Sequence, residues 1–230
     1  MNKTKMMKIG NGNFDIELST RTGIEIVEAG EVKFLGLHLD NKLIWSSEVN
    51  YIISRINAHT SLMYRLRYLF KHTSDVLRKI TSAILFPIVD LFAVLYHTAP
   101  LRLLDKLEVS YRKLIRAILF ITPADRIHNE VLYSAVKWMP LHDKRNLQCK
   151  LLMHKIMYNN LIITCKSAWQ KVQDTHAYNV RNTSDYRTTH VYKQAGKNMI
   201  GYRLIKLWNE IPIELRQTEK YTLFAKSMVK

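Results

Sequence analysis

Residues 32–69 read VKFLGLHLDNKLIWSSEVNYIISRINAHTSLMYRLRYL, and the spacing of the apolar residues changes within this stretch. The first eight residues are rich in apolar side chains and predict a strand, in which Gly36 indicates a bend or a close approach to the backbone. After Trp45, apolar residues recur at every third or fourth position, which is typical of an amphipathic helix. They are Val49, Ile52, Ile53, Ile56, Leu62, Leu66 and Leu69.

The residues before this stretch also predict strands. Phe14, Ile16 and Leu18 alternate with acidic residues, which is the pattern of a half-buried strand, and Ile24 and Ile26 flank Glu25 in the same way. We therefore expect an α+β fold, in which a small antiparallel sheet is followed by helices.

The rest of the chain predicts helices. One begins near Ser74 and is kinked or restarted by Pro87, and another covers residues 101–121 and is stopped by Pro123. Further on, we expect a helix over 142–158 with Lys144, Arg145, Lys150 and Lys155 facing outward, a polar link over 171–197 and an apolar segment over 200–224. The expected domains are 1–44 (sheet), 45–125 (basic helical) and 126–230 (C-terminal helical).

Positive charge is concentrated after residue 50. The 230 residues include 35 Lys and Arg against 19 Asp and Glu, a formal net charge of +16. Residues 1–50 hold six basic and seven acidic residues, so the remaining 180 hold 29 and 12, a net charge of +17. Such an excess favours a polyanionic partner, because Lys and Arg displace counterions from phosphates.

Composition argues against several classes of protein. Two cysteines, Cys149 and Cys165, are too few for a disulfide-stapled scaffold and indicate a reducing compartment, the nucleus or the cytoplasm. The best membrane candidate, residues 83–95, is 13 residues long and contains Asp90 and Pro87, so it predicts a buried helix and no membrane partner.

No motif points to catalysis. Acidic residues are never adjacent, and Asp15 and Glu17 on one strand face are better explained as solvated side chains than as Mg²⁺ ligands. The chain has no C-x-x-C, H-E-x-x-H or G-x-S-x-G motif. The sequence therefore predicts no catalytic residue, no metal site and no cofactor.

Basic residues interleave with aromatic ones along the helical part of the chain, for example at Tyr51, Tyr64 and Tyr68. Nucleic-acid bases stack on aromatic rings while cations follow the backbone. Aromatic residues at helical spacing are also common in protein cores, and Lys and Arg commonly cover a solvated face. Both interpretations stay open at this point.

Three motifs, taken in order, resemble a known family. Lys3-Thr4-Lys5-Met6 is followed by Lys33-Phe34-Leu35-Gly36, which continues to Trp45, and later by Leu207-Trp208-Asn209-x-Ile211-Pro212. This order resembles the C-terminal part of reverse transcriptases of non-LTR (LINE-type, jockey-like) retrotransposons: the end of the palm, the thumb and the C-terminal region. The resemblance covers most of the chain.

The resemblance implies binding of a template–primer by an RNA-directed DNA polymerase. The Lys33–Gly36 segment resembles the primer grip, a hairpin whose turn holds the end of the primer strand; there Gly36 would permit close approach of the backbone and Lys33 would supply a cation. The alternative is a plain strand with an exposed lysine and a glycine bulge. The following helix resembles the thumb helix along RNA or an RNA–DNA duplex, with sequence-nonspecific contacts to phosphate and sugar. Its basic residues are Arg55, Arg65, Arg67 and Lys71.

The family's paired catalytic aspartates precede the K-T-K segment, and this chain begins at Met1, beyond that point. We therefore expect a fragment that is inactive alone, for which the palm and fingers are a missing partner and Mg²⁺ matters only in the full-length enzyme. An alternative is a helical protein–protein interaction module with no nucleic-acid role. A third is a decayed reading frame that folds poorly because palm strands without neighbours leave open edges.

Overall fold

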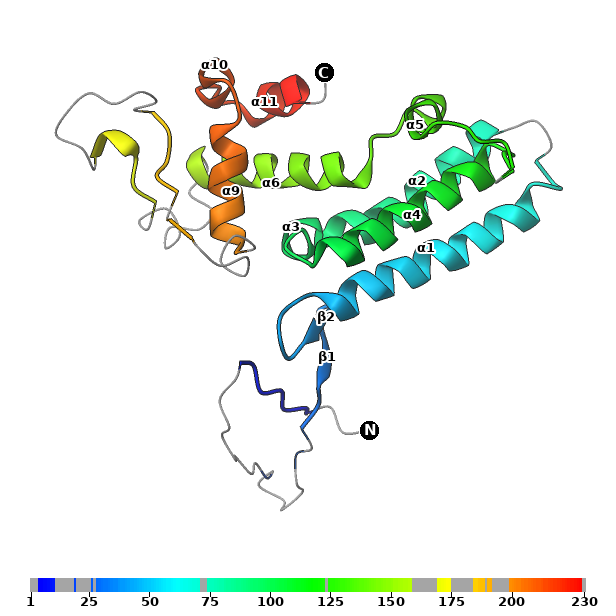
Figure 1. The fold of residues 1–230 in the computed structure, drawn as a ribbon, viewed down its shortest axis with the longest axis horizontal. Coiled ribbons are helices and arrows are strands. Elements are labelled where there is room, and N and C mark those ends of the chain that lie inside the picture. The colour runs from blue at the N-terminus through cyan, green and yellow to red at the C-terminus, as the bar shows by residue number, and fades with distance from the viewer. Residues whose placement is uncertain are drawn as a thin grey trace. The chain divides into compact units, whose positions relative to one another are not determined.

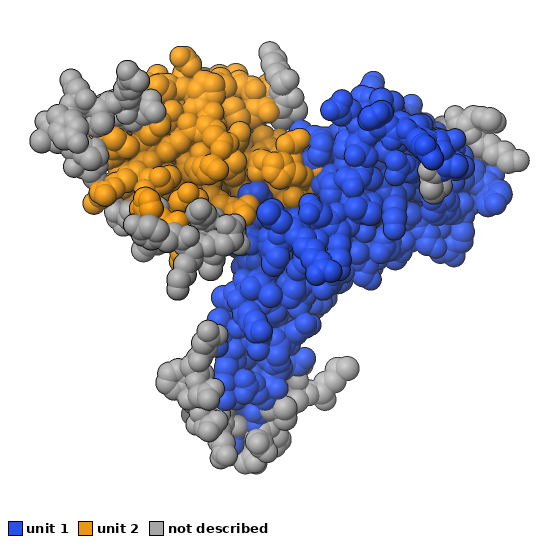
Figure 2. Space-filling model, in the orientation of Figure 1, with its two compact units in different colours: residues 1–140 blue, residues 141–230 orange. Residues whose placement is uncertain are grey.

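The computed structural model describes residues 4–10, 19, 26, 28–70, 74–122, 124–158, 169–174, 184–188, 190–191 and 199–228. The chain divides into two compact units, Met1–Pro140 and Leu141–Lys230 (Figure 2). The boundaries expected near residues 44 and 125 concern smaller segments and stay predictions.

Unit 1 contains an antiparallel hairpin of β1 (Glu31–Phe34) and β2 (Leu37–Asp40), in which Lys33 pairs with His38. Leu35 and Gly36 form the turn, with φ values of 48° and 90°. Two positive φ values are typical of a tight two-residue hairpin turn, and glycine adopts them readily. A Cβ added to Gly36 would meet no described atom within 4 Å. The positive φ, and not close packing, therefore accounts for a glycine at this position.

The hairpin corrects the expectation of one bent strand over residues 32–39, because apolar content alone does not register a two-residue turn. Nearby, Met6 forms an isolated parallel bridge with Glu28. The expected strand over residues 14–18 lies outside the described residues, as do Ile24 and Glu25. The expected fold class, a small antiparallel sheet followed by helices, is confirmed.

The helices of unit 1 form a bundle in which α1 packs against α2 and α4, and α4 also contacts α5 (Figure 1). The apolar periodicity places Val49, Ile52, Ile56 and Met63 of α1 in the core, where all four are fully buried. The bounds are α1 (Ser46–Leu66), α2 (Ser74–Leu91), α3 (Ala93–Tyr96), α4 (Leu101–Ile118) and α5 (Asn129–Val136).

Pro87 lies inside helix α2 and does not end it. Helix α2 continues through Pro87, and the helical path restarts five residues later at Phe92, between α2 and α3. Because a proline removes one backbone donor and leaves the other helical hydrogen bonds in place, the packed helix tolerates it. Helix α4 ends at Ile118, and Pro123 lies outside the described residues. Helix α5 was not predicted.

Unit 2 is built on α6 (Leu141–Tyr158), which packs against α9 (Ile200–Asn209) and α11 (Tyr221–Met228). Its other elements are the 3-10 helix η1 (Val172–Asp174) and α10 (Ile213–Arg216).

His154 of α6 is fully buried. Its ring centroid lies 4.3 Å from that of Phe224, and its Nε2 lies 2.6 Å from the carbonyl oxygen of Thr218. Since a carbonyl only accepts, Nε2 carries the proton.

The expectation that Arg145 faces outward is wrong, because this side chain is buried. Leu141, Arg145, Cys149 and Met153 recur every four residues and are all buried, so Arg145 lies on the inner face of α6. Of the residues expected to face inward, Ile156 is buried, while Leu147 and Leu151 are half-buried.

The Leu207–Pro212 motif has a structural role in unit 2. Trp208 is buried, and the Asn209 side chain clamps the backbone of Tyr186: Oδ1 accepts from its N–H at 3.1 Å and Nδ2 donates to its carbonyl at 2.8 Å. Arg216 Nη1 contacts Asp185 Oδ1 at 2.8 Å, and both side chains are mostly buried. These contacts fix residues 185–186 against α9 and α10.

Within the described part of the chain, no helix is long and apolar enough to cross a membrane.

Candidate nucleic-acid interface

The junction between the hairpin and α1 is held by one carboxylate. Trp45, at the N-cap of α1, has φ of 62° and makes no side-chain capping hydrogen bond. Asp40 replaces that cap: Oδ1 accepts from the N–H of Ile44 at 2.9 Å and Oδ2 from the N–H of Ser46 at 3.0 Å. Two backbone donors at the start of a helix are thereby satisfied, which fixes the angle at which the hairpin meets α1.

A second carboxylate joins the same two elements, but here the acceptor is on α1 and the donor is on the hairpin. Glu48, in the first turn of α1, accepts a hydrogen bond from the backbone N–H of His38 in β2, with 2.8 Å between Oε2 and N. Burial raises the pKa of Glu48, and the His38 N–H and the charges of His38 and Lys33 partly offset this effect. The hairpin is therefore attached to α1 by hydrogen bonds from both sides.

Tyr51 of α1 lies beneath the cross-strand pair Lys33–His38. The His38 ring stacks on the Tyr51 ring with centroids 4.5 Å apart, and Lys33 Nζ lies 5.7 Å from the Tyr51 centroid. An ammonium group at this distance from an aromatic ring gains a modest cation–π attraction. The hairpin thus places the Lys33 cation over the outer surface of α1.

Lys33 continues a row of cations along α1. Arg55 follows Tyr51 by four residues and Arg65 follows Arg55 by ten, so at about 100° per residue the two arginines lie within roughly 80° of each other around the helix. Lys33, Arg55 and Arg65 are all exposed, and no carboxylate among the described residues lies within ion-pair distance of them. We call these three residues the cationic face.

The other predicted binding residues lie elsewhere. Gly36 is at the hairpin turn, and Lys71 is outside the described residues. Arg67 is roughly 160° around the helix from Arg65, and its guanidinium carbon lies 5.2 Å from the Tyr64 ring centroid and 4.7 Å from that of Phe120. The structure therefore joins three of the six predicted residues in one row, and Arg67 lies outside that row against two aromatic rings at the end of α1.

The two rings belong to a pocket of about 460 Å³, lined by Tyr64, Arg65, Arg67, Tyr68 and Phe120, which we call the aromatic pocket. The sequence had identified its two tyrosines as aromatic residues among basic ones. Phe120 was missed, because it follows α4 and meets the end of α1 only after the helices pack. Its φ of 60° is unusual for a non-glycine residue, and the sequence does not reveal this conformation.

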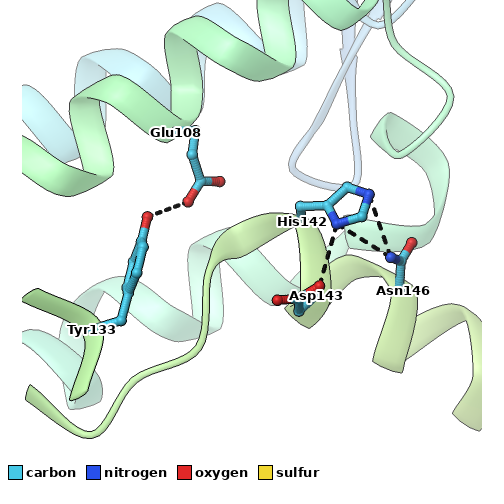
Figure 3. Close-up of polar contacts among 5 residues, drawn as sticks. All are labelled: Glu108, Tyr133, His142, Asp143 and Asn146. Atoms are coloured by element: carbon cyan, nitrogen blue, oxygen red, sulfur yellow. Dashed lines mark hydrogen bonds and ion pairs between the residues drawn. The ribbon is translucent and has the colours of Figure 1, made fainter. Parts of the chain in front are cut away.

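Two further sets of polar side chains make contacts, each set within its own unit (Figure 3). In unit 1, Tyr133 of α5 donates a hydrogen bond to Glu108 of α4, and burial together with this carboxylate raises the pKa of Tyr133. This hydroxyl stays protonated at neutral pH and links two helices. In unit 2, His142 Nδ1 lies 3.3 Å from Asp143 Oδ1 and contacts Asn146, and all three residues lie at the start of α6.

The described hydrogen bonds of the two sets join tyrosine to glutamate and histidine to aspartate and asparagine, which is not the arrangement of an activated nucleophile. Cys149 is buried, and burial raises its pKa to about 12, which keeps it a neutral thiol. Among the residues that the structure describes, no three His, Cys, Asp or Glu side chains cluster as metal ligands would.

Unit 2 has a hollow of its own, of about 390 Å³, at the junction of α6, α9 and α10. Tyr158, Lys171, Tyr186, Trp208 and Arg216 contribute to its lining. The charge of Arg216 is neutralised by Asp185, so this hollow presents less free positive charge than the cationic face.

Comparison with known proteins identifies no relative: no family model, no curated protein and no solved structure matches this chain.

Proposed function

We propose that this chain is the thumb-side part of an RNA-directed DNA polymerase of the non-LTR retrotransposon type, and that it binds RNA or an RNA–DNA duplex without copying it. The observation that supports the proposal most directly is the cationic face. A hairpin lysine and two helix arginines share one exposed side of unit 1, and none of them has a described carboxylate within ion-pair distance, although Glu48 attracts Lys33 from further away.

The chemistry of the cationic face suits phosphates more than bases. Lys and Arg side chains that project from one helix face meet successive phosphates of a backbone, and such contacts carry no sequence information. Each neutralised phosphate contributes about −0.9 to the slope of log affinity against log salt for a DNA duplex. Three contacts therefore predict that raising salt from about 50 to 200 mM weakens binding roughly 40-fold.

The hairpin supports the same proposal. Hydrogen bonds that the Asp40 and Glu48 carboxylates accept from backbone N–H groups fix β2 against α1, so the hairpin turn at Leu35–Gly36 and the cation of Lys33 have a defined position relative to Arg55. A rigid turn beside a basic helix would hold one strand of a duplex while the helix follows its backbone, as a primer grip does.

The proposed chain does not polymerise by itself. Its sequence has no adjacent pair of acidic residues to hold Mg²⁺, so catalysis would depend on a palm and fingers part that carries the aspartates and the metal. We propose the nucleus or cytoplasm as the compartment, where RNA and reduced cysteines occur together.

Fluorescence anisotropy of a labelled blunt 20-base-pair RNA–DNA duplex tests the proposal. We expect binding that weakens steeply as salt rises and that is similar for duplexes of unrelated sequence. Primer extension with Mg²⁺ and nucleotides should give no product. Absence of duplex binding at low salt, or binding indifferent to salt, contradicts the proposal.

A second candidate function, a protein–protein interaction module, is favoured by the hairpin turn. Phe34 and Leu35 are 60% and 83% exposed there, which leaves apolar surface uncovered. Replacing both with serine should abolish capture of a protein partner under this second candidate. Under the leading proposal the same change should leave the salt slope of duplex binding in place.

A further inference from the structure

The aromatic pocket at the C-terminal end of α1 holds an arginine whose position is fixed. The guanidinium of Arg67 lies between the rings of Tyr64 and Phe120, at 5.2 and 4.7 Å from their centroids. Contacts on two sides restrict the rotation of this long side chain, so its donors face a defined direction. Phe120 reaches this position with a φ of 60°, a conformation that costs energy for a residue with a Cβ.

The tyrosines of the pocket remain at the surface. Tyr68 is 79% exposed and Tyr64 is 42% exposed, although aromatic residues at helical spacing are commonly buried. Arg65 lines the same pocket and also belongs to the cationic face. The lining thus combines three aromatic rings with two arginines, and none of its described residues is acidic.

From this geometry we infer that the aromatic pocket binds an unpaired nucleobase of a single-stranded segment that continues from a duplex held on the cationic face. This inference rests on the proposed function, because it assigns the pocket a role beside that duplex. Bases stack on exposed tyrosine rings whatever their identity, and arginines neutralise the adjoining phosphates. A volume of about 460 Å³ falls within the usual range of ligand pockets and accommodates a base with its sugar.

Arg65 provides the connection between the two sites. Arg65 is the last cation of the cationic face along α1. Together with its neighbour Tyr64, it also lines the aromatic pocket. A strand whose phosphates follow Arg55 and Arg65 reaches the end of the helix at the pocket, where its next base is no longer paired. The pocket offers stacking surfaces and phosphate contacts, so RNA and DNA overhangs should both bind.

The test compares three labelled probes by fluorescence anisotropy at one salt concentration: a blunt RNA–DNA duplex, the same duplex with a four-nucleotide overhang, and the same duplex with an abasic overhang. Stacking of one base is worth roughly 1–3 kcal/mol, so the overhang should tighten binding about 5- to 150-fold. The abasic overhang supplies phosphates without bases and should gain much less.

Variants then assign the effect to the pocket. Tyr68→Ala should remove most of the gain from the overhang and leave affinity for the blunt duplex unchanged, whereas Tyr68→Phe should retain the gain. Leu69→Ala is the matched control, because Leu69 is equally exposed (77%) and is adjacent in sequence. Circular dichroism of each variant confirms that it is folded.

The outcomes separate this inference from the proposed function. Equal affinity of the wild-type chain for blunt, abasic and intact overhang duplexes overturns the inference and leaves the proposed function standing. An overhang effect that survives Tyr68→Ala also overturns it. Failure of the blunt duplex to bind counts against the proposed function, and in that case quenching of 2-aminopurine in a single strand by wild-type chain but not by Tyr68→Ala still supports the pocket.

Discussion

Glu48 Oε2 accepts the backbone N–H of His38 across the junction between α1 and β2, at 2.8 Å. Asp40 satisfies two N–H groups at the start of α1 from the other side of the same junction. The motif that resembles the primer grip is therefore also a structural joint, and its acidic residue belongs to the joint. Whatever the hairpin binds, its position depends on these two carboxylates.

Replacing Asp40 with Ala should destabilise unit 1. The change leaves the N–H groups of Ile44 and Ser46 without their acceptor, and loss of a helix cap typically costs about 0.5–2 kcal/mol of unfolding free energy. Urea unfolding followed by circular dichroism measures the loss. Asn41→Ala is the control, because its side chain is exposed and its replacement should change stability by less than about 0.5 kcal/mol. Equal effects of the two variants would refute the capping role.

Glu48 should make stability depend on pH in a defined direction. Its pKa in the folded chain is raised above the ordinary value by burial, so the neutral carboxyl favours folding more than the carboxylate does. The contribution is fully present below the unfolded pKa and is lost as pH rises through the folded pKa.

Glu48→Gln removes this ionisation while keeping an oxygen that accepts from His38. We therefore expect the unfolding free energy of the variant, relative to wild type, to increase as pH rises from about 4 to 7. Urea titrations of both proteins at several pH values provide the comparison. A difference that is constant or that falls with pH shows that the Glu48 pKa is not raised.

The Asn209 clamp should protect the backbone of Tyr186. Both of its hydrogen bonds go to that one residue, so Asn209→Ala leaves an N–H and a carbonyl unsatisfied, at about 1–2 kcal/mol in total. Hydrogen exchange of the Tyr186 amide should accelerate in this variant. Glu210→Ala changes an exposed neighbour and should leave the exchange rate as in wild type. Unaltered protection in Asn209→Ala means that the clamp does not form.

Cys149 should be chemically inert in the folded chain. Burial raises its pKa to about 12, so almost no thiolate is present at pH 8. In a Cys165→Ser background, a thiol reagent such as DTNB should react slowly with native protein and rapidly after unfolding in urea. Fast stoichiometric labelling of the native chain contradicts the burial of Cys149.

The helices could be predicted where one apolar face repeats over several turns, as at Val49, Ile52 and Ile56 of α1. Further along, the predicted stripe included Leu69, which is 77% exposed, and missed the buried Met63. The hairpin turn does not follow from apolar content, because a run of apolar residues over 32–39 hides a two-residue reversal at Leu35–Gly36; only the resemblance to a primer grip predicted a hairpin there. Arg145 was predicted to face outward because it is charged. Its four-residue spacing from Leu141 and Cys149 instead places it on the same buried face of α6.

The binding residues were predictable in kind but only partly in place. Arg55 and Arg65 project from one helix face, as their spacing requires. Arg67, two residues further along, lies on another side of the helix and contacts the ring of Phe120. That contact joins residues more than fifty positions apart, and only the packing of α1 with α4 creates it.

The salt dependence of duplex binding in a charge-neutralised variant tests the central claim most directly. Arg55→Gln/Arg65→Gln removes two cations from the cationic face, and Lys106→Gln/Lys113→Gln removes two exposed cations from α4. Fluorescence anisotropy across about 50–200 mM salt gives each slope of log affinity against log salt. We predict that the arginine variant has a slope shallower than wild type by roughly 2, while the lysine variant keeps the wild-type slope. Identical slopes for all three proteins, or an equal loss in both variants, would contradict the account.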